Sequence, residues 1–134
     1  MNRDEYFKIL EKIISLITEA QSLAQKINVK NLSQPGIIKE IITAYNLKHR
    51  LHPEKHEHDA EEFDDSTIRY EYLSCLEGKS FQFDRVDDEN LKRRIKERNN
   101  AIFCSIFDKE DQLTIMRIYR VEPKSLYDIL SKKH

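Results

Sequence analysis

The sequence predicts one α+β domain with a central mixed, mostly antiparallel β-sheet, flanking helices and a long N-terminal helix. A segment over residues 4–27 repeats apolar residues at helical spacing, and later segments rich in β-branched and aromatic residues alternate with helical ones. The resulting order is helix, helix, strands, helix, strands, helix. This order excludes a helical bundle and a doubly wound sheet, and a length of 134 residues corresponds to a single domain, 1–134.

The composition is that of a globular protein with a modest core. Apolar residues make up 39% of the chain and charged residues 35%, with 23 basic against 24 acidic side chains. No apolar run approaches the roughly 18 residues of a membrane span, and the first residues lack the apolar core of a secretory signal. The two cysteines, Cys75 and Cys104, cannot build a disulfide framework. We therefore expect a cytoplasmic protein without membrane association.

The N-terminal helix carries the clearest periodicity. Its seam follows steps of four and three residues, and further apolar residues widen that seam to nearly half the circumference. The seam consists of Tyr6, Leu10, Ile13, Ile17, Ala20, Ala24 and Ile27, and the widening residues are Ile9, Leu16 and Leu23. Either the whole stripe packs into the core of its own chain, or one edge of it faces a second subunit.

A turn at 31–36 precedes a second helix with apolar residues from Ile37 to Tyr45. A polar stretch, 49–58, follows and is interrupted by Pro53. Two strands are then predicted at 59–63 and 67–75, with a third at 80–83 after Gly78.

Asp87 or Asp88 can cap a further helix that runs to about Asn99. The segments 101–107 and 113–121 are predicted to form a closing hairpin. A short terminal helix is expected from Pro123, because proline suits the first turn of a helix.

Two acidic residues on the first predicted hairpin are candidate metal ligands. Asp59 opens one strand and Glu71 lies in the middle of the next, so the turn between them can bring the two carboxylates together. Carboxylates held together in a partly buried site repel each other unless a cation lies between them, which makes this pair a candidate Mg²⁺ site. The alternative is that both are ordinary solvated surface groups.

Several segments resemble the PvuII-like type II restriction endonucleases of the PD-(D/E)xK nuclease superfamily. The similar segments, which are collinear, are Gln34-Pro-Gly36 with the helix through Lys39 and Glu40, His58-Asp-Ala60, Tyr70-Glu-Tyr-Leu-Ser74, Ala101-Ile-Phe-Cys-Ser-Ile-Phe107 and Ile118-Tyr-Arg-Val-Glu-Pro-Lys124. The resemblance implies a restriction-endonuclease-like fold and a homodimer formed through residues 1–30. It also implies that 31–134 is a catalytic and DNA-binding core with duplex DNA as substrate, Mg²⁺ as cofactor, and Asp59 and Glu71 as catalytic metal ligands.

The chain departs from this family at one catalytic position. The family's lysine lies two residues after the glutamate, and that position here is Leu73. Three groups are candidates to replace it. Arg69 shares a strand face with Glu71 by alternation, although a guanidinium cannot act as a base. A lysine of the 92–98 segment, Lys92 or Lys96, can reach in, and Glu77-Gly78-Lys79 is a literal ExK in which the glycine favours a turn. The family's additional glutamate, shortly before its aspartate, has no exact counterpart here: His56 takes that offset, and Glu54 and Glu57 lie nearby.

The densest basic patch lies on the predicted helix near residue 90. Its members are Lys92, Arg93, Arg94, Lys96 and Arg98. With Lys79, they are the expected DNA-binding residues, since arginine can contact both phosphate and the guanine edge. The competing interpretation is a solvated helix face.

Four histidines within ten residues form a second candidate site. They are His49, His52, His56 and His58. Imidazoles this close together can bind Zn²⁺, and His52 and His56 would share a helix face if a helix continued past Pro53. The alternative is a polar loop whose histidines approach DNA phosphate.

The sequence therefore leaves three functions to compare. The first is a homodimeric, Mg²⁺-dependent, type II site-specific deoxyribonuclease. The second is a DNA-binding protein on the same fold that has lost catalysis, because Leu73 occupies the position of the family's lysine. The third is a small interaction protein that dimerises through residues 4–27.

Overall fold

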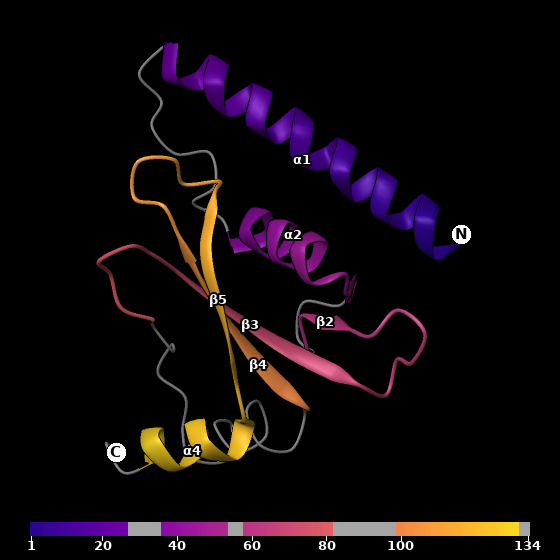
Figure 1. Cartoon of the computed structure of the whole chain (residues 1–134), viewed down its shortest axis with the longest axis vertical. Coiled ribbons are helices and arrows are strands. Elements are labelled where there is room, and N and C mark those ends of the chain that lie inside the picture. The colour runs from indigo at the N-terminus through magenta and orange to yellow at the C-terminus, as the bar shows by residue number, and fades with distance from the viewer. Residues whose placement is uncertain (27–35, 54–57, 82–98, 132–134) are drawn as a thin grey trace.

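A computed structural model describes residues 1–26, 36–53, 58–81 and 99–131 (Figure 1). The elements are α1 (Arg3–Lys26), α2 (Gly36–Leu47), β1 (Arg50–Leu51), β2 (Ala60–Glu61), β3 (Arg69–Leu76), β4 (Ala101–Phe107), β5 (Ile115–Val121) and α4 (Pro123–Ser131). The predicted α+β class is confirmed, as are both N-terminal helices, the closing hairpin and the terminal helix.

The described strands form one sheet in the order β1-β2-β3-β4-β5. Only β3 and β4 are parallel, and the other three pairs are antiparallel, so the prediction of a mixed, mostly antiparallel sheet is confirmed. β4 lies between two long neighbours and is buried along almost its whole length, which explains its continuous apolar run. β5 lies at the edge of the sheet, where only Ile115, Ile118 and Val121 are half-buried and its other residues are exposed.

Helices cover both faces of this sheet. On one face, Ala44 of α2 packs with Tyr70, Tyr72 and Phe103 in a buried cluster. On the other face, residues of α4 pack against Ile102 and Cys104. α1 lies outside α2 (Figure 1), and the Leu51 amide donates a 2.8 Å hydrogen bond to the Tyr6 hydroxyl, which ties α1 to β1.

α1 buries only part of its apolar stripe. Phe7, Leu10 and Ala24 are buried, whereas Ile9, Leu16 and Leu23 are 47%, 52% and 57% exposed. The widening residues of the seam therefore do not pack on the described part of their own chain. No helix in the described ranges has the length and apolar character needed to cross a membrane.

Two local predictions are wrong. The third strand expected at 80–83 does not form in its described part, because Ser80 and Phe81 lie outside any strand. A turn precedes them, in which Gly78 has a φ of 82° and the Lys79 amide bonds to the Leu76 carbonyl. Conversely, β1 lies inside the stretch that was expected to be a polar loop. The helix predicted after Asp87 lies outside the described residues up to position 98, and Asn99 is not helical.

Candidate functional site

Asp59 lies where the short strand β2 begins beside the longer strand β3. Its amide donates to the Tyr70 carbonyl at 3.0 Å, and its carboxylate Oδ2 accepts a 2.8 Å bond from the Tyr72 amide. The β2–β3 pairing consists of Ala60 with Tyr70 and Glu61 with Arg69. Because β2 begins at Ala60, the edge of β3 beyond Tyr70 is open to the Asp59 side chain. The aspartate is thus held by backbone groups on both sides of Glu71.

Glu71 is on β3 opposite Ile102 of β4 and is only 4% exposed. The β2–β3 register, continued by one residue, brings Asp59 opposite Glu71 on the same face. Neighbouring Tyr70 and Tyr72 turn to the other face and pack beneath α2. The pairing of two short segments therefore directs both predicted carboxylates to one region.

A third carboxylate, Glu40 of α2, belongs to the same site. The pKa of Glu40 is raised to about 8, most of all by burial and then by the charge of Asp59, the hydrogen bond to Asp59 and the charge of Glu71. Protonated Glu40 donates a hydrogen bond to Asp59. The carboxylate cluster, Glu40, Asp59 and Glu71, thus collects three acidic side chains from a helix, a strand entry and a strand.

Sequence reasoning did not select Glu40 as a site residue, although a signal was present. It is the only acidic residue in the mainly apolar helix GIIKEIITAYNL. Acidic side chains are mostly exposed unless a partner pairs with them, and Glu40 is half-buried. The donor type, carboxylate oxygen from three elements, is the one that Mg²⁺ prefers, but among the described residues these three carboxylates are not close enough to form a ready-made metal-binding group.

The position of the family's lysine is apolar in three dimensions as well as in sequence. Leu73 packs against the buried pair Ile102 and Cys104, together with Phe81 and residues of α4. Arg69 is exposed at the start of β3. Burial is the main cause that lowers the pKa of His58, and the positive charge of Arg69 also lowers it. The other expected catalytic or DNA-binding residues, Lys92, Arg93, Lys96 and Arg98, lie outside the described part of the chain.

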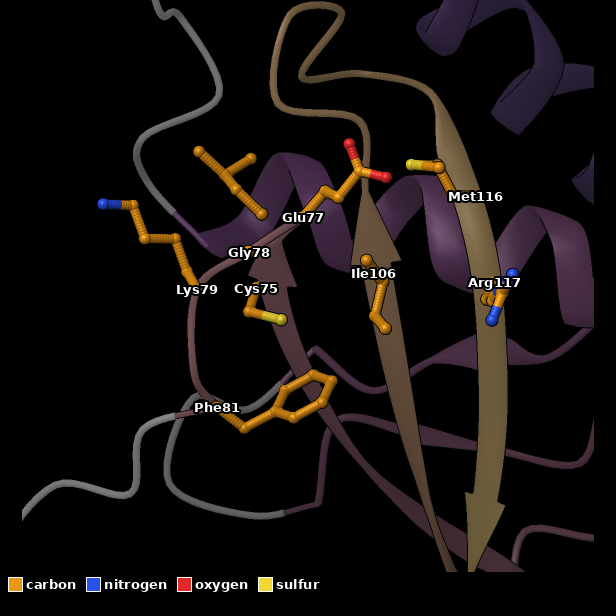
Figure 2. A pocket seen from close by; sticks show the side chains of 9 residues that line it. Cys75, Glu77, Gly78, Lys79, Phe81, Ile106, Met116 and Arg117 are labelled. Atoms are coloured by element: carbon orange, nitrogen blue, oxygen red, sulfur yellow. The ribbon is translucent and has the colours of Figure 1, made fainter.

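Lys79 lies at the far end of β3 from the carboxylate cluster. It lines a pocket of about 270 Å³ together with Cys75, Gly78, Phe81 and Ile106, and Figure 2 shows its amino group directed away from Cys75 and Ile106. Since a strand rises about 3.3 Å per residue, Glu71 is roughly 15 Å or more away along β3. The literal ExK at 77–79 lies in a turn and is too far away to belong to the carboxylate cluster. Lys79 remains only a predicted DNA contact.

The predicted histidine cluster is rearranged in space. His52 Nδ1 and His58 Nε2 lie 3.0 Å and 3.3 Å from the same Glu61 oxygen, Oε1, and these three residues form a set that could hold a metal ion. His52 follows β1 and is not helical, so the helix on which His52 and His56 could have shared a face does not include His52. His56 lies outside the described residues. Glu61 was not selected from the sequence.

His49 has a different environment from these histidines. Its Nδ1 lies 2.7 Å from the Tyr72 hydroxyl, and its ring stacks on Tyr70 at 4.2 Å between centroids. Burial lowers the pKa of His49 to about 4, although the charge of Glu62 acts in the opposite direction. It is a neutral core histidine and not a ligand of the cluster at Glu61.

Comparison with known proteins does not assign the chain to a family. No family model matches the chain, and no curated protein matches it.

Proposed function

We propose that the protein is a Mg²⁺-dependent endonuclease of the type II restriction class that hydrolyses phosphodiester bonds of duplex DNA. The observation that carries the proposal is the carboxylate cluster, Glu40, Asp59 and Glu71, at the open edge of a mixed sheet. The fold class agrees with it, and so does the collinear sequence resemblance to PvuII-like enzymes. The finer assignment to the PD-(D/E)xK fold is part of the proposal.

Each residue of the cluster has a distinct part in the proposed reaction. Asp59 and Glu71 hold the cation, and Glu40 joins them when it gives up its proton. Bound Mg²⁺ would supply charge at the scissile phosphate and lower the pKa of water. Asp59 is positioned by the Tyr72 amide, and Glu71 is positioned by its place within the β3–β4 pairing. Backbone contacts thus position each of the two oxygen donors, and electrostatic catalysis requires such preorganisation.

The test is cleavage of varied duplex DNA by the purified chain with Mg²⁺ or Mn²⁺. The wild type should give discrete fragments, and Asp59→Asn and Glu71→Gln should reduce the rate by 10²-fold or more, roughly as for loss of a charged catalytic group. Glu62→Gln is the matched control, since Glu62 is a neighbouring acid that accepts a 2.6 Å hydrogen bond from the Tyr70 hydroxyl. Absence of fragments with both metals, from a protein that binds DNA, would exclude the endonuclease.

A catalytically inactive DNA-binding protein is the second candidate, and the packing of Leu73 favours it. The side chain at the lysine position contributes to the apolar cluster around Ile102, so it has a structural role that a charged group would not have. This alternative expects DNA binding that survives the double change Asp59→Asn with Glu71→Gln, and no hydrolysis in any form.

Leu73→Lys separates the two candidates, with Leu73→Met as the apolar control. A weakened nuclease should gain cleavage with lysine and not with methionine. An inactive binding protein should gain nothing from either change and should only lose stability with lysine, because an ammonium then enters an apolar cluster.

We also propose that α1 forms a homodimer interface. Ile9, Leu16 and Leu23 are exposed at seven-residue spacing, the repeat by which paired helices bury a common stripe. A second copy of α1 offers the same stripe, so a symmetric pairing covers both. A dimer would also bring two carboxylate clusters to one duplex, as cleavage of both strands requires.

A further inference from the structure

We propose that His52, His58 and Glu61 form a second metal site, selective for Zn²⁺ and separate from the carboxylate cluster. The three side chains flank and occupy the β1–β2 hairpin: His52 follows β1, His58 precedes β2, and Glu61 ends β2. The Leu51–Ala60 pair holds the hairpin together, and the His52 amide donates to the Asp59 carbonyl at 2.9 Å. The ligands are therefore positioned by backbone pairing, not by long mobile side chains.

The separations of the ligand atoms match a tetrahedral ion. Zn²⁺ binds imidazole nitrogen and carboxylate oxygen at about 2.0–2.2 Å, so neighbouring ligand atoms of a tetrahedron lie about 3.3 Å apart. His52 Nδ1 and His58 Nε2 lie 3.0 Å and 3.3 Å from Glu61 Oε1, and one ligand atom from each residue lies within 4.8 Å of the other two. The two distances to Glu61 Oε1 thus match the edges of such a tetrahedron.

The chemistry of the three ligands differs from that of the carboxylate cluster. Two imidazoles and one carboxylate are typical of Zn²⁺ and other borderline transition metals, whereas Mg²⁺ prefers oxygen donors only. His58 is 2% exposed and Glu61 is 9% exposed, so two of the three ligands are almost completely shielded from solvent. Three protein ligands leave a fourth position for water.

An ion at this site would cross-link a weak part of the sheet. β1 and β2 each contain only two residues, and a two-stranded ribbon of that length is not stable alone. The hairpin leads directly into Asp59, so a cross-link from His52 to Glu61 would also fix the first residue of the carboxylate cluster. Arg69 pairs with Glu61 across the sheet, and its positive charge acts on His58. This charge would repel a bound cation, so Arg69→Gln should tighten metal binding.

Zn²⁺ and Co²⁺ binding to the metal-free full chain tests the site without any activity measurement. The wild type should bind one equivalent of Zn²⁺ per chain by calorimetry, and Co²⁺ should give the intense visible absorption of a four-coordinate ion. Loss of a residue that only hydrogen-bonds a metal ligand weakens binding by roughly 10- to 100-fold. His52→Gln and Glu61→Gln remove a ligand itself and should weaken Zn²⁺ binding more than that. Glu62→Gln is the matched control for Glu61→Gln and should bind as the wild type does.

Failure of this site can be told apart from failure of the proposed nuclease site. The double variant Asp59→Asn with Glu71→Gln removes the Mg²⁺ ligands and should still bind Zn²⁺ with wild-type affinity. Loss of Zn²⁺ binding in that variant, with full retention in His52→Gln, would assign the ion to the carboxylate cluster and overturn the inference. Absence of stoichiometric Zn²⁺ and Co²⁺ binding by the wild type would overturn it as well.

A measurement on the wild type alone guards against variants that fail to fold. X-ray absorption at the zinc edge should show nitrogen and oxygen neighbours at about 2.0–2.1 Å, with the outer-shell scattering of two imidazole rings. A spectrum without imidazole scattering would contradict the assignment to His52 and His58.

Discussion

The hydroxyl groups of Thr43 and Ser105 lie 3.2 Å apart and join α2 to β4 inside the core. Thr43 uses its own hydrogen to donate to the Lys39 carbonyl at 2.8 Å, so Ser105 is the donor of the pair. Both residues are almost completely buried, with exposures of 1% and 0%. The polar contact therefore fixes the helix that carries Glu40 to the centre of the sheet.

Removing the two partners of this contact should have unequal effects. Thr43→Val leaves the buried Ser105 donor without its acceptor and should cost about 1–3 kcal/mol in the free energy of unfolding. Ser105→Ala leaves Thr43 bonded to Lys39 and should cost about 0.5–1.5 kcal/mol. The double variant should be no less stable than Thr43→Val alone, as measured by urea denaturation.

Thr18→Val is the control for this cycle. Thr18 also donates to a carbonyl four residues earlier, that of Ile14, but on the exposed surface of α1. Its replacement should change stability by less than about 0.5 kcal/mol. Additive effects of Thr43→Val and Ser105→Ala would show that the two hydroxyls are not coupled.

Glu40→Gln should stabilise the metal-free protein at pH 8. The folded chain raises the pKa of Glu40 from its ordinary 4.5 to about 8, first through burial and then through Asp59 and Glu71. Folding then becomes less favourable as pH rises through this interval, because the folded state holds a proton that the unfolded state releases. Glutamine removes this cost, and we expect a gain of about 1–3 kcal/mol at pH 8 that shrinks toward pH 4.5. Chemical denaturation in the presence of a chelator measures it.

The same substitution should reduce the stabilisation that Mg²⁺ or Mn²⁺ gives the wild type. Glu19→Gln, on the exposed surface of α1, should change neither quantity. A loss of stability on Glu40→Gln at pH 8 would show that the three carboxylates do not repel one another.

His49 should contribute to unfolding in mild acid. Burial lowers its pKa from the ordinary 6.5 to about 4, with Glu62 opposing and Arg120 assisting the shift. The unfolded chain therefore binds the extra proton first as pH falls, so the stability that neutral His49 provides is complete above pH 6.5 and is lost between 6.5 and 4. The expected loss is about 2 kcal/mol at pH 4.5.

Unfolding free energies of wild type and His49→Gln at pH 7 and pH 4.5 isolate this contribution. Glutamine can still bond to the Tyr72 hydroxyl but does not titrate. The variant should be closer to the wild type at pH 4.5 than at pH 7. An equal difference in unfolding free energy at the two pH values would mean that folding does not lower the pKa of His49.

Leu16→Glu should convert the proposed dimer into a monomer. Leu16 lies in the middle of the exposed stripe and is 52% exposed, so the change should have little effect on the fold of a single chain. Light scattering coupled to size-exclusion chromatography should give twice the chain mass for the wild type and the chain mass for the variant. Ser15→Glu alters the adjacent exposed position and should remain dimeric, and a monomeric wild type would contradict the interface.

The sequence predicted the elements well where one local pattern dominates. Continuous apolar character predicted β4 because a strand buried on both faces needs nothing else. The parallel alignment of β3 with β4 had no local signal, since it depends on how the chain returns between two strands. β1 was also hidden, because its two residues lie among histidines and a proline.

The residues of the candidate sites also differ in whether a local sequence pattern could identify them. Asp59 and Glu71 could be found because they flank one hairpin, and their separation in sequence is short. Glu61 could not be selected, because two histidines meet around its oxygen only in the folded hairpin. Glu40 carried a weak signal as the acidic residue of α2, but its approach to Asp59 depends on the docking of α2.

The parallel pairing of β3 with β4 has a consequence for the order in which the protein matures during translation. Glu40, Asp59 and Glu71 all leave the ribosome before Ala101, yet seven consecutive residues of β3 pair with β4, and only Tyr70 among them also pairs with β2. The acidic residues are thus made early and assembled late. A nascent chain arrested before Phe107 should therefore lack a formed carboxylate cluster.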